Sequence, residues 1–499
     1  MNKYFAMRKI IILLFLIIPC FALSQENQYN PQITRLTLED VIQIAQQQSP
    51  SAMSARHRFK NSYWQYRYFK ANYMPQVSLY GNPLQFENQN RMIETPTGSE
   101  FVRYNQIYSD LSLGIDQAVG FTGGNLSVFT NLGYTMNFKE DTMYFSSAPI
   151  NVRYTQPIFG YNSYKWERKI EPIKFKEAQQ SYIESMEDVA ITAANYFFSC
   201  LLAQMNKSIQ EINLANNDTL HQIAQGRYMM GTIAENEVLN MELNYLNSKS
   251  QLETAKLDLE MNLFDLKSFL RIKEDAEIEL IPPAIIPELE IDADEAVIQA
   301  NENRSDVLSY ERQLIEAEQA LTKAKREGRF SMDLSLTYGL DKTAPTFPQA
   351  YREPSQRQVA MLGINVPILD WGRAKGQIKM AESQQELIRT TVEQNIIDFN
   401  QEIYIKAKQF NMQYSQLMIA AKSDTVAQKR YEFTKQRYLI GTIDITELNS
   451  SLADKDSNQR GYIAALQQFW VNYFQIRRLT LYDFVRKEKI KTEIDVLMQ

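Results

Sequence analysis

The feature that most restricts the fold of this chain is a motif that occurs twice at a fixed distance. RYMMGTIAENEVLN begins at Arg227, and RYLIGTIDITELN begins 210 residues later at Arg437. The phrases QPIF and VPIL precede the two motifs with the same offset. Pro157 and Pro367 therefore each stand 70 residues before a motif, which predicts a rigid element of fixed length in each of two repeats.

The spacing of apolar residues predicts that this element is a long helix. Apolar positions recur in both copies at steps of mostly four and three. No proline occurs between Pro172 and Pro282, or after Pro367. At 1.5 Å per residue, such a helix would span about 105 Å, a length typical of a coiled-coil tunnel or rod. The positions are Tyr182, Met186, Val189, Ala193, Phe197, Leu201, Met205, Ile209 and Ile212, then Ile388, Val392, Ile396, Phe399, Ile403, Phe410 and Leu417.

Two segments, about residues 75–158 and 330–369, are predicted to be strands because apolar and polar residues alternate in them. Each run has about the 9–11 residues of a membrane strand, and tyrosines near the ends of the runs suit a membrane interface. Apolar side chains would then face lipid and polar ones a lumen, as in a transmembrane β-barrel. A soluble β-sandwich with one solvated face would alternate in the same way. The alternating residues are Leu79, Leu111, Leu113, Leu126, Val128, Leu132, Leu334 and Leu336.

Residues 1–24 are predicted to be a signal peptide. Lys3, Arg8 and Lys9 precede the apolar run IIILLFLII, and ALS, ending at Ser24, fits a cleavage site. The run is shorter than the ~20 residues of a spanning helix, which favours cleavage. The alternative is that the segment is retained as a membrane anchor. No later stretch is apolar enough to cross a membrane as a helix, so a crossing would require a closed barrel of strands.

Charge and cysteine content exclude other classes. Cleavage leaves 50 basic against 59 acidic residues, a net charge near −9, which argues against nucleic-acid binding. Cys200 is then the only cysteine, so no intramolecular disulfide can form, and its setting in YFFSCLL predicts burial. GFTGGN, from Gly120, lacks the lysine of a phosphate-binding loop and suits a strand turn.

No catalytic, cofactor-binding or metal-binding constellation is found in the sequence. His57 and His221 are the only histidines, and neither has the spacing of a metal motif. We therefore expect neither an enzyme nor a cofactor.

The predicted organisation is a signal peptide (1–24), a first repeat (25–272), a proline-rich connector (273–293), a second repeat (294–486) and a C-terminal tail (487–499). Each repeat consists of helices, strands and a long helical hairpin, over 161–272 and 370–486. Three prolines in the connector preclude a regular helix there, so it is expected to lie extended across the helices.

The two-fold repeat, the QPIF and VPILDWGRAKGQI junctions and the paired RYxxGT turns together resemble the TolC-type outer-membrane efflux family, over about residues 33–485. The resemblance implies an α+β membrane protein, a homotrimer whose helical hairpins form a tunnel across the periplasm. Its strands would contribute to a trimeric transmembrane β-barrel in outer-membrane lipid. The implied function is the exit duct of a tripartite efflux or type I-like secretion system.

Such a duct works with a periplasmic adaptor (membrane fusion) protein and an inner-membrane transporter. A non-conducting periplasmic coiled-coil adaptor or scaffold is the alternative, although an adaptor would carry a single hairpin. The sequence names neither the cargo nor the pump and adaptor.

One departure from the family concerns the strands. The resemblance implies two strands per repeat, whereas the first repeat has roughly 45 more residues between its first strand and QPIF than the second, and shows four candidate strands. The extra pair would either extend above the membrane or pair as an added hairpin.

The motif itself predicts a hairpin tip. Gly231 and Gly441 suit helix ends that need a positive φ, and Thr232 with Glu235, or Asp444 with Glu447, fits a capping box. These signals are explained by helix joining alone. The resemblance adds that adaptors dock at such tips, with candidate residues Arg227, Tyr228, Gly231, Thr232, Arg437, Tyr438, Gly441 and Thr442.

The resemblance also implies a gate at the tunnel entrance. Glu237 and Glu447 stand where the family has aspartates, while Asn240 and Ser450 occupy the positions three residues further on. Three Glu447 side chains around a trimer axis would attract cations. An ordinary solvated helix face explains these residues equally well.

Overall fold

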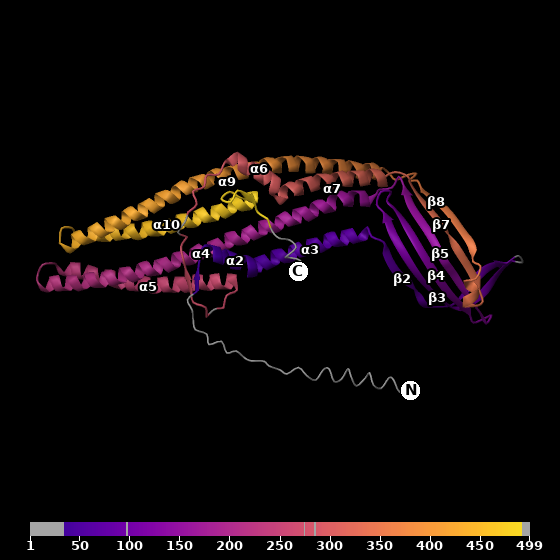
Figure 1. Cartoon of the computed structure of the whole chain (residues 1–499), viewed down its shortest axis with the longest axis horizontal. Coiled ribbons are helices and arrows are strands. Elements are labelled where there is room, and N and C mark those ends of the chain that lie inside the picture. Colours follow the sequence, from indigo (N-terminus) through magenta and orange to yellow (C-terminus); the bar gives the residue numbers. More distant parts are fainter. Residues whose placement is uncertain (1–33, 96–97, 274, 284–285, 492–499) are drawn as a thin grey trace, which may run out of the picture.

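The structure is a computed structural model that describes residues 34–95, 98–273, 275–283 and 286–491. A long bundle of helices carries a curved antiparallel sheet at one end and two helical hairpins at the other (Figure 1). The signal peptide expected at residues 1–24 lies outside the described residues. Among the described residues, the helices include none that is both long and apolar enough to cross a membrane.

The helices of the two repeats agree in length, pair by pair. Each repeat has helices of 11, 23, 67 and 36 residues in the same order. These equal lengths support the division of the chain into two repeats. The first repeat contains α2 (Leu38–Gln48), α3 (Pro50–Asn72), α4 (Ser163–Met229) and α5 (Glu235–Leu270), and the second contains α6 (Ala293–Asn303), α7 (Ser305–Glu327), α9 (Arg373–Leu439) and α10 (Ile445–Thr480).

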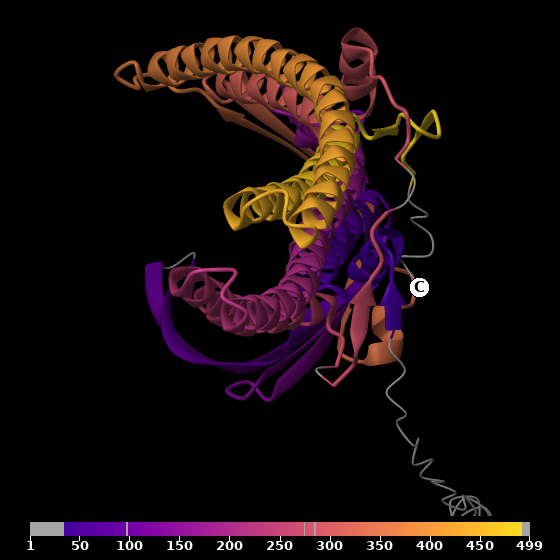
Figure 2. The same cartoon turned by 90° about the vertical axis from the view of Figure 1, so that its left-hand side faces the viewer.

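Each 67-residue helix is covered by two different partners along its length. α4 packs against α5 towards the tip and against α2 and α3 towards the sheet, and α9 packs in the same way against α10, α6 and α7 (Figure 1). The return helices α5 and α10 are only about half as long as α4 and α9. Seen from the tips, the helices form a curved wall (Figure 2).

The main core lies at mid-length, where helices of both repeats meet. Phe197 and Phe198 of α4, Phe410 of α9 and Phe469 of α10 are essentially inaccessible there. Most of the predicted apolar stripe is buried or half-buried, but Ile212 and Ile396 are exposed on the single chain. These two residues lie outside the narrow strip along which each long helix contacts its neighbours.

The connector crosses the bundle and is held by two side-chain amides. Gln204 of α4 exchanges hydrogen bonds with the backbone N–H and C=O of Leu280, at 3.0 and 3.1 Å. Asn411 of α9 does the same with Ile291, at 2.9 Å for each bond. The connector also contains β6 (Ile278–Leu280), which pairs in parallel with β1 (Thr34–Leu36). These bonds satisfy backbone groups that no helix or large sheet pairs.

Six long strands form one antiparallel sheet in the order β2-β3-β4-β5-β7-β8. The strands are β2 (Gln76–Thr95), β3 (Gly98–Val119), β4 (Gly124–Asn137), β5 (Thr142–Ile158), β7 (Ser331–Ala344) and β8 (Ser355–Asn365). The short α8 (Phe347–Ala350) lies between β7 and β8, and a small pair, β9 (Tyr482–Asp483) and β10 (Glu488–Lys489), follows α10. The extra pair of the first repeat is therefore an integral part of the sheet.

The register gives the sheet two chemically different faces. Leu113 stands opposite Leu79, and Ile115 opposite Val128, so one face is apolar. This face continues through Val152, Tyr154, Leu334, Leu336 and Leu362 on the following strands. The other face carries Asp110, Ser112, Asp116, Ser127, Asn131, Arg153, Thr155, Asp333, Ser335 and Thr337.

The cysteine in the core gives a simple check of this packing. Cys200 is fully buried, and burial raises the pKa of its thiol to about 12. Because the thiolate is the reactive species, the folded protein should not react with a thiol reagent at pH 8. Unfolding in guanidinium should release one reactive thiol per mature chain, measured with Ellman's reagent. Rapid reaction of the folded protein would show that α4 packs differently.

Candidate functional site at the hairpin tips

The two tips have the same backbone hydrogen bonds. In the first, the N–H of Gly231 donates to Tyr228 O at 2.8 Å and that of Thr232 to Arg227 O at 3.0 Å. In the second, Gly441 donates to Tyr438 O at 2.9 Å and Thr442 to Arg437 O at 3.0 Å. This pair of bonds is the Schellman motif, which satisfies carbonyls at a helix end. The RYxxGT pattern therefore encodes the turn.

Positive φ angles explain both glycines. Gly231 has φ +71° and Gly441 has φ +79°, while space for a side chain is free at both positions. The requirement is therefore conformational and not steric.

One predicted capping box is wrong. The hydroxyl of Thr232 donates to Arg227 O at 2.8 Å, so it closes the first helix, and α5 begins at Glu235 after Ala234, an N-cap without a side-chain hydrogen bond. At the other tip, Asp444 caps α10 by accepting from the N–H of Glu447 at 2.9 Å. The threonine directly follows the glycine and bonds back to the first helix, while the N-cap position of the return helix is Ala234.

Four exposed apolar residues of the tips were not among the predicted docking candidates. Met229 is 85% exposed and Ile440 is 74% exposed, and Met230 and Leu439 are also exposed. They are the two apolar positions inside RYxxGT. Because an exposed apolar patch commonly marks a contact surface, these four residues are additional docking candidates beside the residues that form the turn. Their apolar character in both copies was the signal in the sequence.

One contact joins the two tips directly. The guanidinium of Arg227 lies over the ring of Tyr438, 5.9 Å from its centroid. Burial raises the pKa of the Tyr438 hydroxyl, and nearby Glu237 raises it further, while Arg227 opposes both. The structure therefore brings together three of the predicted residues from two hairpins.

The four predicted entrance residues lie near the start of the return helices. Glu237 and Asn240 are on α5, Glu447 and Ser450 are on α10, and all four are exposed in the single chain. Within the described part of the chain, the carboxylates of Glu237 and Glu447 make no hydrogen bond or ion pair. They are thus available to solvent or to another protomer.

A buried polar link holds the two hairpins together further from the tips. The Nδ2 of Asn213 on α4 donates to Oδ2 of Asp456 on α10 at 2.6 Å, with both residues buried. Lys455 lies 3.3 Å from Asp456 Oδ1 and 4.7 Å from the ring centroid of Tyr431. Buried partners of this kind are costly to separate, because each would be left desolvated.

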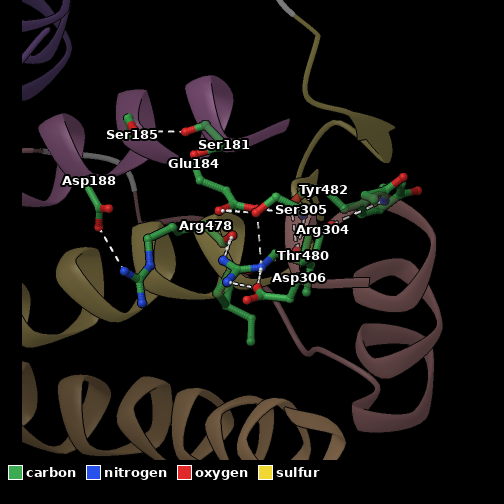
Figure 3. A network of polar contacts seen from close by, with 12 residues as sticks. Ser181, Glu184, Ser185, Asp188, Arg304, Ser305, Asp306, Arg478, Thr480 and Tyr482 are labelled. Atoms are coloured by element: carbon green, nitrogen blue, oxygen red, sulfur yellow. Dashed lines mark hydrogen bonds and ion pairs between the residues drawn. The ribbon is translucent and has the colours of Figure 1, made fainter. Parts of the chain in front are cut away.

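A second network fixes the hairpins at mid-length (Figure 3). Ser305 donates to Glu184 through its N–H at 2.8 Å and its hydroxyl at 2.9 Å, and Arg304 lies 3.4 Å from the same carboxylate. Arg478 of α10 pairs with Asp188 of α4 at 3.0 Å. Burial raises the pKa of Glu184, and Arg304 opposes the shift. The network ties α4 to the α6–α7 junction and to α10.

Among the described residues, no group of three or more histidine, cysteine, aspartate or glutamate side chains could hold a metal ion. The tips present exposed apolar side chains and exposed carboxylates.

Comparison with known proteins agrees with this geometry. Residues 296–480 match the family model of the outer membrane efflux protein. A Haemophilus influenzae protein described as uncharacterized is 21% identical over 378 residues, 72% of this chain and 78% of that protein. The toxin and drug export protein A of Aggregatibacter actinomycetemcomitans is 21% identical over 64% of this chain and 68% of its own length.

Solved structures show the same fold across the chain. The CmeC outer membrane channel of Campylobacter jejuni superposes with a TM-score of 0.65, at 14% identity, covering 92% of this chain and 88% of that one. The chain thus has the fold of that protein, with long helices joined to an antiparallel sheet, and the predicted fold class is confirmed. Over its second repeat the chain is similar to the outer membrane efflux protein family, and over most of its length it shares the fold of the solved channel.

The tip glycines give a test of the docking surface. Gly231→Val or Gly441→Val should cost about 1–2 kcal/mol locally, because a β-branched residue resists positive φ. We expect export to fall in a strain that lacks the chromosomal copy, while the amount of trimer in the outer-membrane fraction stays unchanged.

Gly226→Val is the matched control, because Gly226 lies inside α4 with free space around it. A loss of trimer equal to the loss of export would contradict a role in docking.

Proposed function

We propose that this protein, as a homotrimer, is the outer-membrane exit duct of a tripartite efflux or type I-like secretion system. The sheet would cross the outer membrane and the helices would extend into the periplasm towards an adaptor and an inner-membrane transporter. One observation carries the proposal: a sheet with one continuous apolar face is joined to two hairpins built on 67-residue helices.

The apolar face is exposed, as a lipid-facing surface must be. Leu113 is 47% exposed, and Leu111, Ile115 and Leu336 are similarly open. On the other face Ser112 and Thr337 are buried. A periplasmic scaffold would leave this apolar face in water, which disfavours the non-conducting alternative.

Aromatic side chains lie at both ends of the sheet. Phe121, Phe159, Phe330 and Trp371 are exposed at the end next to the helices. At the far end the ring of Phe86 lies tilted against Phe138, and that of Phe145 lies edge-to-face with Phe347. Two such girdles flank the apolar band of membrane strands. With a tilt of about 40°, the 14 residues of β4 span roughly 35 Å between them, enough for a hydrocarbon core of ~30 Å.

The tips would be the surface for the adaptor. Met229, Met230, Leu439 and Ile440 offer apolar anchors on two hairpins of similar shape. Since both tips have the same backbone turn, one type of adaptor hairpin could bind each of them in turn.

The relatives suggest the class of cargo. One of them is described as a toxin and drug export protein, and we extend export of this kind to the present chain as part of the proposal. In a duct of this kind the inner-membrane pump would select the cargo.

Trp371 tests the position of the membrane. It lies between β8 and α9 and is 89% exposed. In liposomes of brominated phosphatidylcholine, part of the tryptophan fluorescence should be quenched, and Trp371→Phe should abolish most of that quenching. Trp64→Phe is the matched control, because exposed Trp64 lies on α3, more than two turns from its end at Asn72. Unchanged quenching in Trp371→Phe would place the membrane elsewhere.

Conductance tests the duct itself. In planar bilayers the purified trimer should open ion channels, whereas a scaffold should produce none. Glu447→Gln should lower the cation selectivity, because three carboxylates near one axis would attract cations. The reversal potential in a salt gradient measures this change, with Glu39→Gln on α2 as the control. An unchanged reversal potential would remove Glu447 from the entrance.

A further inference from the structure

The first repeat contributes two more strands than the second, and the structure locates them. Both repeats have a strand after the 23-residue helix, β2 or β7, and a strand before the 67-residue helix, β5 or β8. The added strands are β3 and β4, which lie between β2 and β5 in the middle of the sheet. They therefore widen the wall of the sheet.

The added hairpin is anchored at the helix end of the sheet. Its turn contains Gly123, where φ is +80° and a Cβ would lie 2.9 Å from Asn162. Asn162, the N-cap of α4, donates to Gly120 O at 3.2 Å. Gln117 donates to Tyr73 O, just after α3, at 2.9 Å. The turn thus fits between the end of α3 and the start of α4.

Both added strands have the same two faces as the rest of the sheet. Leu111, Leu113 and Ile115 of β3 share the apolar face with Leu126 and Val128 of β4. On the polar face, Asn131 donates to the hydroxyl of Ser112 at 2.6 Å. A hairpin that projected into water would have no reason to keep an exposed apolar face in register with its neighbours.

The outer strands β2 and β8 each have one unpaired edge. Within a membrane, unpaired backbone groups cost several kcal/mol each, so the edges must be covered. The six strands alternate in direction, so β2 and β8 run opposite to each other. β8 of one copy can therefore pair with β2 of a second copy in an antiparallel ladder, and repetition closes a ring.

We propose that the trimer forms an eighteen-stranded transmembrane ring, in which β3 and β4 supply six wall strands. This inference rests on the proposed function, which provides the trimer. Without the added hairpin the same repeats would give twelve strands. With a strand spacing of about 4.8 Å and a tilt of about 40°, the backbone radius is about 18 Å for eighteen strands and about 12 Å for twelve.

The wider ring changes the duct at one end only. Each protomer keeps two hairpins, so the tunnel does not grow with the sheet. Rings of sixteen to eighteen strands leave an aqueous channel, whereas small ones are filled by side chains. The membrane end is therefore an open, polar-lined exit, and the helices set the size limit for cargo.

Cysteine labelling tests whether β3 and β4 belong to the wall. Leu113→Cys on the apolar face should be protected from a charged methanethiosulfonate in proteoliposomes, and Asn131→Cys on the polar face should react. Leu336→Cys and Ser335→Cys on β7 are the matched control pair, with the same expected contrast. Buried Cys200 contributes no background.

The outcomes separate the two proposals. If the trimer forms and the β7 pair shows the contrast, but Leu113→Cys reacts freely, the eighteen-stranded ring is wrong and the duct remains. If Leu336→Cys also reacts, or no trimer forms, the proposed function itself fails.

A second readout uses the wild-type protein. Polyethylene glycol with a hydrodynamic radius of about 8 Å, added at the sheet side, should enter the exit and lower the conductance, because a backbone radius of about 18 Å leaves room for it. Conductance unaffected by this polymer would contradict the eighteen-stranded ring.

Discussion

A helix of 67 residues needs apolar cover along its whole length, and this requirement organises the molecule. Helix propensity alone contributes little, so α4 and α9 depend on tertiary packing. A return helix of 36 residues covers about half of each, and a pair of 11 and 23 residues covers the rest. The break between the two covers lies at mid-length. The largest core cluster, the connector and the Glu184 network all lie there. The ends of the covering helices meet at this break, so their polar backbone groups need hydrogen-bond partners beside the apolar core.

The sheet follows a different rule. Each strand needs its neighbours as hydrogen-bond partners. The two faces of the sheet differ in polarity, so each suits a different solvent. One apolar face and one polar face, kept in register over six strands, suit a wall between lipid and water. The added β3–β4 hairpin keeps this rule and is fixed to the helices through Asn162 and Gln117. The number of strands and the number of helices can therefore vary independently in one fold.

The tips combine a fixed backbone with variable side chains. The same Schellman bonds form at Gly231 and Gly441, yet the N-caps of the return helices differ. Ala234 has no capping side chain, whereas the carboxylate of Asp444 caps α10. Arg227 and Tyr438 connect the two tips, and the apolar pairs Met229–Met230 and Leu439–Ile440 point outwards. A partner would thus meet two similar shapes with different charge, which suits hairpins that divide docking and gating.

The sequence by itself determined the two-fold repeat, the long helices, the strand segments and the turns, because each depends on local periodicity and on glycines that local geometry requires. Cys200 was placed correctly for the same reason. The sequence did not reveal that Thr232 closes the first helix, since cap residues with similar spacing can serve either helix. It also left the position of β3 and β4 open, and gave no sign of the Asn213–Asp456 link or the Gln204 and Asn411 clamps. Only the tertiary structure decided these, because pairing order and buried polar contacts join residues far apart in the chain, and no local pattern encodes which distant partner is met.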